Sequence, residues 1–295
     1  MAVTKSEAAK LTQDMMLRGV IETVVKESSI LAMLPFMQVV GTALTYNREN
    51  TMPEADFYEP GDVWFVDTPT WSTQTQELKI IGGDADVDNF LQQTYSDPND
   101  IEAVVLESRA KAVAHKWSDT FYNGDTSAGS KSFDGLRERV PGSQKIETDE
   151  NGGPLTLDKM DELVDLVRPG RPDALLMHKR TRRKLSSLRR DSGNLLETDV
   201  DDFGRRALFY DGIPILVDDF VAVDETHGSG EDLSSIYAVK LGSDGVMGIE
   251  NQGIQVEEIG SLETADATRW RIKWYAAMVV LSELGVARLE GIEGN

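Results

Sequence analysis

Between residues 103 and 121, apolar side chains recur every three or four positions. Such spacing places them on one face of a helix. Asp97 can cap the start of this helix, Pro98 suits its first turn, and Asn123 followed by Gly124 can end it. We therefore predict a helix of about 25 residues, near 37 Å long, with an apolar face formed by Ala103, Leu106, Ala110, Val113, Trp117 and Phe121.

Alternation of apolar and polar residues predicts strands elsewhere in the chain. The strongest example is 269–281, and residues 39–46 and 72–80 alternate in the same way, with Val40, Thr42, Leu44 and Tyr46 on one side of the first. The apolar residues 174–177 predict a buried strand, and further short strands are predicted at 213–217, 236–241, 254–258 and 286–289. We expect a glycine-punctuated turn before 254–258, and we expect 286–289 to fold back on 269–281 through Gly285.

The segment from Arg48 to Thr70 separates two of these strands. It holds three prolines and six acids against one base. A solvated, disordered loop rarely carries many aromatic residues, yet this region contains Phe57, Tyr58, Trp64, Phe65 and Trp71. We interpret it as a long hairpin whose tip packs against another surface, and a second chain is one candidate for that surface.

The remaining segments predict a helix or arm before a subdomain boundary and two helices after it. Residues 5–34 are irregularly amphipathic and predict a helix or arm that Pro35 closes, whereas the glycine-rich residues 124–154 are typical of a boundary between subdomains. Thr156 can cap a short helix after this boundary. A basic helix then follows the strand at 174–177 and extends through Arg190, and we expect a loop from there to Phe203.

Composition narrows the classes of protein. The 295 residues contain 30 Lys and Arg against 51 Asp and Glu, a formal net charge of −21, and no Cys. An acidic surface repels phosphates, which argues against a protein that reads nucleic-acid sequence. The absence of Cys excludes disulfides and thiolate metal sites. The N-terminus lacks a signal-peptide pattern, and the longest apolar run, 275–281, is far shorter than the roughly 20 residues that span a bilayer, so we expect a soluble, folded chain.

One segment has the opposite charge. Residues 168–190 contain nine bases and one acid, a net charge of +8, so the rest of the chain carries −29. Such a cluster can bind phosphates. It can equally meet the acidic surface of an identical neighbour, and we favour this second interpretation because complementary patches promote ordered self-association.

Two motifs resemble ligand loops only in part. Asp84, Asp86 and Asp88 match the first half of a calcium loop, but Asn89 replaces the required Gly and Tyr95 the bidentate Glu. An exposed strand explains the same residues. Residues 124–132 are one position away from a phosphate-binding loop, but they follow a predicted helix C-terminus, where the helix dipole is negative.

The other chemical candidates are less specific. His115, His178 and His227 are isolated, and no pair has metal-ligand spacing. The Gly-Ser-Gly at 228–230 is more simply a hairpin tip than a nucleophile elbow. Neighbouring acids such as those at 218–219 are common in a chain with this many carboxylates. We therefore predict no catalytic residue, no metal site and no cofactor.

Taken in order, these segments resemble the major capsid proteins of tailed bacteriophages, which have the Hong Kong 97-type capsid fold shared by encapsulins. Residues 121–125 with 133–136 resemble the end of that family's spine helix and the segment after it. Residues 176–178 through 193 resemble its apical strand and helix, and residues 210–215 with 218–219 its apical hairpin. The resemblance covers nearly the whole chain and rests on the order of the motifs.

The resemblance implies an α+β fold with an N-terminal arm, an extended hairpin loop, a peripheral domain with a spine helix, and an apical domain. The expected boundaries are 1–37 for the arm, 38–82 for the loop, 83–150 for the peripheral domain, 151–255 for the apical domain and 256–295 for the return strands of the peripheral domain. No Lys lies between Lys26 and Lys79, so the isopeptide crosslink that some members form from this loop should be absent. Some members begin with a long scaffolding segment that a protease removes. Here the spine helix is expected to start near residue 98, which leaves no room for such a segment and implies a separate scaffolding protein or none.

The function that the resemblance implies is that of a major capsid protein, which forms the pentamers and hexamers of an icosahedral shell around double-stranded DNA without sequence-specific contact. It places the protein in the virion after assembly in a host cytoplasm, and leaves portal, scaffolding and decoration proteins open as partners. An encapsulin-like nanocompartment and an acidic α+β enzyme are the alternatives. The residues that we expect at subunit interfaces are Arg48, Glu54, Phe57, Tyr58, Trp64, Phe65, Arg180, Arg182, Arg183 and Lys184.

Overall fold

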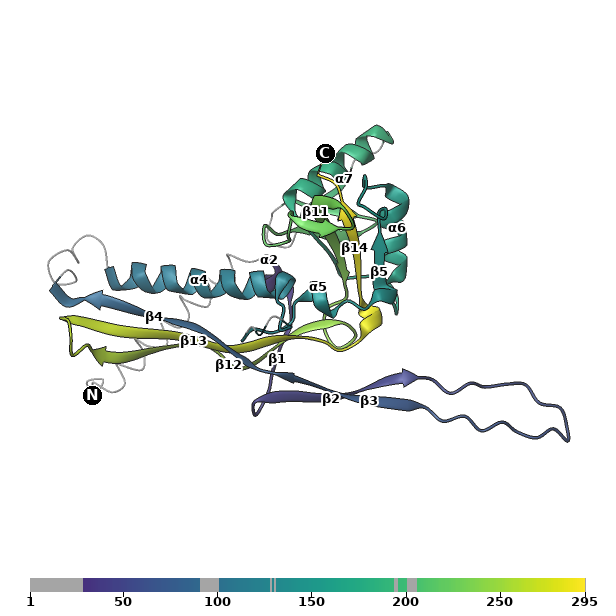
Figure 1. The fold of residues 1–295 in the computed structure, drawn as a ribbon, viewed down its shortest axis with the longest axis horizontal. Helices are drawn as coiled ribbons and strands as arrows, with labels where there is room; N and C mark the ends of the chain where they lie inside the picture. The colour runs from purple at the N-terminus through teal and green to yellow at the C-terminus, as the bar shows by residue number, and fades with distance from the viewer. Residues whose placement is uncertain are drawn as a thin grey trace.

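A long helix lies along a twisted sheet, a second sheet stands upright at one end of it, and a hairpin projects beyond that end (Figure 1). The computed structural model describes residues 29–90, 101–127, 129, 131–193, 196–200 and 206–294. No helix among the described residues is long and apolar enough to cross a membrane.

The peripheral sheet has the strand order β1-β12-β13-β4. Its strands are β1 (Phe36–Gln38), β4 (Lys79–Asp88), β12 (Val246–Ser261) and β13 (Ala267–Val280). β13 is antiparallel to both of its neighbours, whereas β1 runs parallel to β12. The predicted strand at 269–281 is therefore confirmed as the long central member of this sheet.

Helix α4 (Ile101–Asn123) packs across the peripheral sheet. Five of the six residues predicted for its apolar face are buried, and Ala103 is exposed. Trp117 lies at the centre, with its ring centroid 5.8 Å from that of Trp274 and 5.7 Å from that of Phe36. Gly248 makes room for the Phe36 ring, because a Cβ there would lie 2.4 Å from it.

The N-terminal side of this core is only partly described. Helix α2 (Ser29–Met33) buries Ile30 and Leu31 in the core beneath α4. The predicted cap at Asp97 and most of the predicted arm at 5–34 lie outside the described residues.

The hairpin consists of β2 (Ala43–Thr51) and β3 (Thr70–Glu77), which pair in antiparallel register. The predicted hairpin is confirmed, but two of its details are wrong. β2 begins at Ala43 rather than at residue 39, because Gly41 turns the chain with a φ of +113°, and Val40 is fully exposed. The predicted strand at 72–80 is divided at Leu78, after which β4 enters the peripheral sheet.

The apical sheet has the strand order β5-β14-β11-β6-β9-β8-β7, and β10 also pairs with β11. Its strands are β5 (Lys145–Glu147), β6 (Ala174–Met177), β7 (Glu197–Val200), β8 (Arg206–Tyr210), β9 (Ile213–Val217), β10 (Glu225–His227), β11 (Gly230–Val239) and β14 (Val286–Ile292). Helices α6 (Leu157–Leu166) and α7 (Lys179–Asp191) lie beside this sheet, the short segments η1 (Gly142–Gln144) and η2 (Glu283–Gly285) lead into β5 and β14, and α5 (Leu136–Arg139) contacts α4.

The central strand β6 is buried along its whole length, as its continuously apolar sequence requires. In β6, Ala174 and Leu176 join the core beneath α4, whereas Leu175 and Met177 join a second core. That second core is covered by α6 and α7 through residues such as Leu163 and Leu185. One sheet therefore separates two cores and belongs to both.

Several predicted elements differ in the structure. The final strand, β14, pairs with β11 and β5 rather than folding back on β13. The expected turn before residue 254 is absent, because β12 continues through a bulge in which Gly253 has a φ of +71°. The region 124–154 contains α5 and β5, and β7 lies in the stretch expected to be a loop after α7.

Candidate assembly surfaces

The hairpin tip, residues 52–69, is held by local contacts rather than by a strand ladder. The phenol of Tyr58 accepts a hydrogen bond from the amide of Phe65 at 3.0 Å and stacks on Trp64, with ring centroids 4.5 Å apart. The amide of Glu54 donates to the carboxylate of Asp67 at 3.0 Å. These contacts pair the two arms of the tip with each other and leave its outer faces open.

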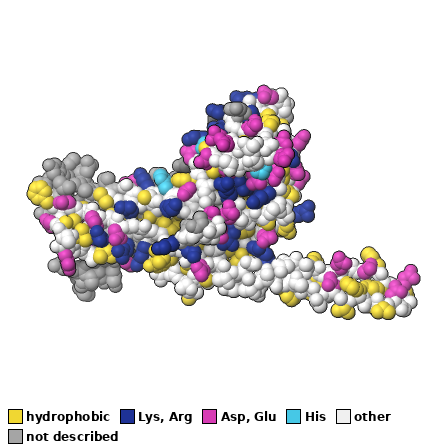
Figure 2. Space-filling model, viewed as in Figure 1, with side chains coloured by type: hydrophobic (Ala, Val, Ile, Leu, Met, Phe, Trp, Pro, Cys, Tyr) yellow, Lys and Arg dark blue, Asp and Glu magenta, His cyan; other side chains and the backbone are white. Residues whose placement is uncertain are grey.

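The apolar side chains of the tip are open to solvent. Phe57 is 102% exposed, Trp64 73% and Phe65 66%. Tips of monomeric proteins rarely present so much contiguous apolar surface, which usually marks a contact with another molecule. The carboxylates of this segment add negative charge around these rings, as Figure 2 shows at the far end of the hairpin.

The root of the hairpin is anchored to the connection between the two sheets. The guanidinium of Arg48 donates to the carbonyls of Val280 at 2.8 Å and Leu281 at 3.3 Å, and pairs with Glu283. The phenol of Tyr46 donates to Val280 as well, at 3.0 Å. Arg48, predicted at a subunit interface, thus has a contact set within its own chain.

A second anchor holds the other strand of the hairpin. The guanidinium of Arg139, in α5, donates to the buried amide oxygen of Gln76 and lies 3.6 Å from Asp134. The prediction from sequence missed this anchor. Gln76 and Arg139 are 63 residues apart, and nothing in either local sequence indicates the contact.

The basic helix α7 begins with an unusual cap. The Nδ1 atom of His178 accepts a hydrogen bond from the amide of Arg180 at 3.1 Å. The partial burial of the ring lowers the pKa of His178, because burial disfavours the charged imidazolium, whereas the nearby Asp219 carboxylate acts in the opposite direction. The neutral ring that can accept this hydrogen bond is therefore the favoured form.

The bases of α7 divide into two groups. Arg180 donates to the carbonyls of Val223 at 3.1 Å and Asp232 at 2.7 Å, so it serves the apical fold. Arg182 and Lys184 are half-buried, whereas Arg183 projects into solvent. Of the four bases predicted at an interface, Arg183 is thus the most accessible.

Apart from Arg48 at the root of the hairpin, the predicted interface residues lie on two separate surfaces. The tip residues lie at the end of the hairpin, and the basic residues lie on α7 at the top of the apical domain (Figure 1). Two separate surfaces are what a subunit with several neighbours requires. The role of these residues in assembly stays a prediction.

Two carboxylates of the partial calcium motif form ion pairs within the chain. Asp84 and Asp86 lie on β4, and their carboxylates accept two hydrogen bonds each from Arg271 and Arg269 on the neighbouring β13. The hydrogen bonds from these guanidinium groups lower the pKa values of both carboxyls. The exposed-strand interpretation is therefore confirmed for these residues.

Asp218 has a structural environment as well. Its carboxylate accepts a hydrogen bond from the phenol of Tyr122 at 3.2 Å and from the amide of Phe220 at 3.0 Å. Burial raises the pKa of Asp218 and also that of Tyr122. The pair joins the end of α4 to the apical sheet, and it lies apart from Asp219, which pairs with Lys179.

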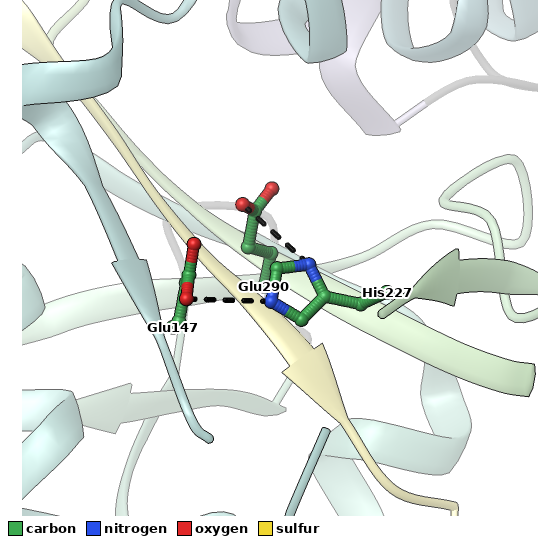
Figure 3. Close-up of side chains that lie close together, drawn as sticks. All are labelled: Glu147, His227 and Glu290. Carbon is green, nitrogen blue, oxygen red and sulfur yellow. Dashed lines mark ion pairs between the residues drawn. The ribbon is translucent and has the colours of Figure 1, made fainter. Parts of the chain in front are cut away.

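One cluster of possible metal ligands was not visible in the sequence. His227 lies between Glu147 and Glu290, with Nε2 3.5 Å from the first carboxylate and Nδ1 3.9 Å from the second (Figure 3). The carboxylate of Glu290 also forms an ion pair with the guanidinium of Arg288, at an N–O distance of 2.8 Å. Because the carboxylates face different ring nitrogens, the arrangement is suited to holding an imidazole between two strands.

Comparison with known proteins identifies the family. A sequence model of the SrpI-like type 2A encapsulin shell proteins matches residues 129–292, which is more than half of the chain. The chain belongs to this family. It matches no curated protein sequence.

Solved structures show that the fold is the Hong Kong 97-type capsid fold. The chain is similar to the holo-SrpI encapsulin of Synechococcus elongatus PCC 7942, with 19% identity, a TM-score of 0.69, and 90% of this chain and 88% of that chain covered. The chain is also similar to a capsid chain of a native GTA particle, with 14% identity, a TM-score of 0.68, and 92% of this chain and 91% of that chain covered. A chain from the structure of Microbacterium phage Oxtober96 shares 14% identity, with a TM-score of 0.67 and 90% of both chains covered.

These findings confirm the predicted fold class and the resemblance to shell-forming capsid proteins. The chain is a shell-forming structural protein of the capsid and encapsulin type, and it assembles with copies of itself.

Proposed function

We propose that this chain forms the pentamers and hexamers of an icosahedral shell, in which the hairpin tip of each subunit lies on a neighbouring subunit. The exposure of Phe57, Trp64 and Phe65 carries this proposal. An isolated two-stranded hairpin is at best marginally stable in water, and this tip has no layer of its own chain beneath it among the described residues. A second copy would supply the missing layer.

The test replaces residues 50–68 with a short Asn-Gly turn. The shortened chain should remain folded and soluble but should not form shells, as seen by negative-stain microscopy and size-exclusion chromatography. Trp64→Ser should weaken assembly in the same direction. Val40→Ser is a matched control, because Val40 is also exposed but lies outside the tip. Normal shells from the shortened chain would refute the proposal.

For the contents of the shell, the proposed function is the packaging of double-stranded DNA in a virion. The similarity to the GTA and phage capsid chains, over about nine tenths of each chain, supports this. The net charge of −21 also suits a wall that does not grip the nucleic acid, if enough of the acids face inward. Purified native particles should then contain DNA that is protected from nuclease.

The second candidate is a nanocompartment that encloses protein. The match to the SrpI-like encapsulin family over residues 129–292 favours it. Its distinguishing result is a second protein that co-purifies with intact shells at a fixed ratio, with no nuclease-resistant DNA. Both candidates share the shell and differ only in its contents, so this measurement separates them.

A further inference from the structure

Two helices of opposite charge cover the apical domain. α6 buries Met160 and Leu163 in the second core, and α7 buries Leu185 in the same core. Between the helices, the phenol of Tyr210 donates to Asp161 of α6 at 2.6 Å, and the guanidinium of Arg189 of α7 lies over the Tyr210 ring at 5.1 Å. These contacts hold the two helices in one fixed arrangement, so their outward faces are parts of one rigid domain.

The outward face of α6 is acidic. Its exposed acids follow the helical repeat at positions 158, 161, 162 and 165. Glu162 is paired with Lys159 at 3.0 Å, and Asp161 is engaged by Tyr210. Within the described part of the chain, no ion-pair partner is assigned to Asp158 or Asp165, and both are exposed.

The outward face of α7 is basic. Lys179, Arg183 and Arg190 are exposed and share one stripe of the helix. Lys179 is paired with Asp219 at 3.1 Å. For the side chains of Arg183 and Arg190, the described residues provide no ion-pair partner.

The charges on the two helices that have no ion-pair partner among the described residues share one spacing. Asp158 and Asp165 are seven residues apart on α6, and Arg183 and Arg190 are seven residues apart on α7. Seven residues correspond to two turns, or about 10.5 Å along a helix axis. Two such helices placed side by side can therefore form two ion pairs at once.

The two faces also point in different directions. In Figure 2, Asp and Glu side chains gather on the flank that carries α6, and Lys and Arg side chains follow the upper edge along α7. A single chain with two different, complementary patches forms a head-to-tail contact, and head-to-tail contacts generate rings when the rotation closes.

We infer that α7 of one subunit docks against α6 of the next around the capsomer ring, through Arg183 and Arg190 on one copy and Asp158 and Asp165 on the other. This inference rests on the proposed function, because it requires a ring of identical subunits. Each exposed ion pair contributes little alone, but the pairs repeat at every contact of the ring and fix the register and order of neighbours.

The test uses charge reversal on each helix. Variant X carries Arg183→Glu and Arg190→Glu, and variant Y carries Asp158→Lys and Asp165→Lys. Each should need at least about a tenfold higher concentration to assemble than the unaltered chain, because attraction becomes repulsion at every contact. A chain with all four reversals should assemble like the unaltered one, since complementarity is restored with the opposite polarity. Circular dichroism confirms that each variant is folded.

Mixing X and Y gives a sharper result. X presents two acidic faces and Y two basic faces, so they can alternate around a ring. Alternation closes in a hexamer, but a pentamer has an odd number of subunits and keeps one mismatched contact. The mixture should therefore restore hexamers in preference to pentamers, as counted by native mass spectrometry.

Two outcomes distinguish failure of the inference from failure of the proposed function. The docking of α7 on α6 is refuted, while the shell remains, if X and Y each form shells at the same concentration as the unaltered chain. It is also refuted if the variant with all four substitutions assembles no better than X or Y. If the unaltered chain forms no shell at all, the proposed function itself fails.

Discussion

The guanidinium of Arg48 donates to the backbone carbonyl of Val280 across 2.8 Å, which joins the root of the hairpin to the last residue of β13. Val280 is followed at once by the connection to β14, so this contact reaches the point where the chain leaves one sheet for the other. The direction of the hairpin is thereby tied to the arrangement of both sheets.

Arg48→Ala should loosen the hairpin without unfolding the subunit. Hydrogen bonds to charged groups contribute about 1.5–3 kcal/mol each, and the carbonyl groups of Val280 and Leu281 would lose the bonds from Arg48, while Tyr46 would still donate to Val280. Amide hydrogen exchange in β2 should become about tenfold faster or more, while exchange in α4 stays unchanged. Arg48→Lys should give an intermediate rate, because one ammonium cannot reach all the acceptors. Unchanged exchange in β2 would show that the anchor does not hold the hairpin.

Trp117→Ala should destabilise the subunit strongly. Trp117 is fully buried and contacts the rings of Phe36, Phe121, Phe133 and Trp274. Truncation of such a residue removes buried area and leaves a cavity, at a cost of about 3–5 kcal/mol. Urea denaturation of the unassembled subunit measures this loss. Trp64→Ala, at the exposed tip, is the matched control and should change the free energy of unfolding by less than about 0.5 kcal/mol.

Arg288→Met should also destabilise the apical domain, for an electrostatic reason. Arg288 and Glu225 are both buried and pair at 2.8 Å. Removing one partner of a buried pair leaves an uncompensated charge, at a cost of about 3–5 kcal/mol. Adding Glu225→Gln to Arg288→Met should recover part of the loss in thermal unfolding experiments. If the double variant is less stable than Arg288→Met alone, the buried charge is not the cause.

Acidification should weaken the start of α7. The folded state lowers the pKa of His178 below its ordinary value of 6.5, so the unfolded state binds the proton more tightly. The stabilisation is therefore present above pH 6.5 and is lost as the pH falls through the folded pKa. Protonation at Nδ1 also removes the acceptor for the Arg180 amide. The protection of that amide, measured as its hydrogen-exchange rate relative to the intrinsic rate at the same pH, should fall below pH 6.5, and His178→Asn, which keeps a capping group, should remove this dependence on pH.

The elements that could be predicted from the sequence are those whose signal is local. The face of α4 follows from a repeat within one helix, and the predicted apolar positions from Leu106 to Phe121 are buried as that repeat requires. The partner of β14 could not be predicted, because the sequence of a short strand such as Val286–Leu289 does not indicate which strand lies beside it. Gly253 was expected in a turn because a bulge and a turn require the same backbone freedom.

At the candidate surfaces too, features with a local sequence signal could be predicted and contacts between distant residues could not. The position of Phe57 and Trp64 in a hairpin tip could be predicted, because they lie in an acidic, proline-containing segment between two alternating strands. The internal roles of Arg48 and Arg180 were not, because their acceptors are backbone carbonyls far away in the sequence. Every carbonyl is an acceptor, so these partners leave no trace in the pattern of side chains.

The alternation of β6 between two cores has a mechanical consequence. Because Leu176 belongs to the core under α4 and Leu175 to the core under α6 and α7, the upright sheet cannot tilt without opening packed surface on one side or the other. The two sheets and the helices packed on them therefore behave as one rigid body. In the assembly proposed above, any difference in curvature between one part of the shell and another would therefore arise at the contacts between subunits, where we propose that the hairpin and the charged helices lie.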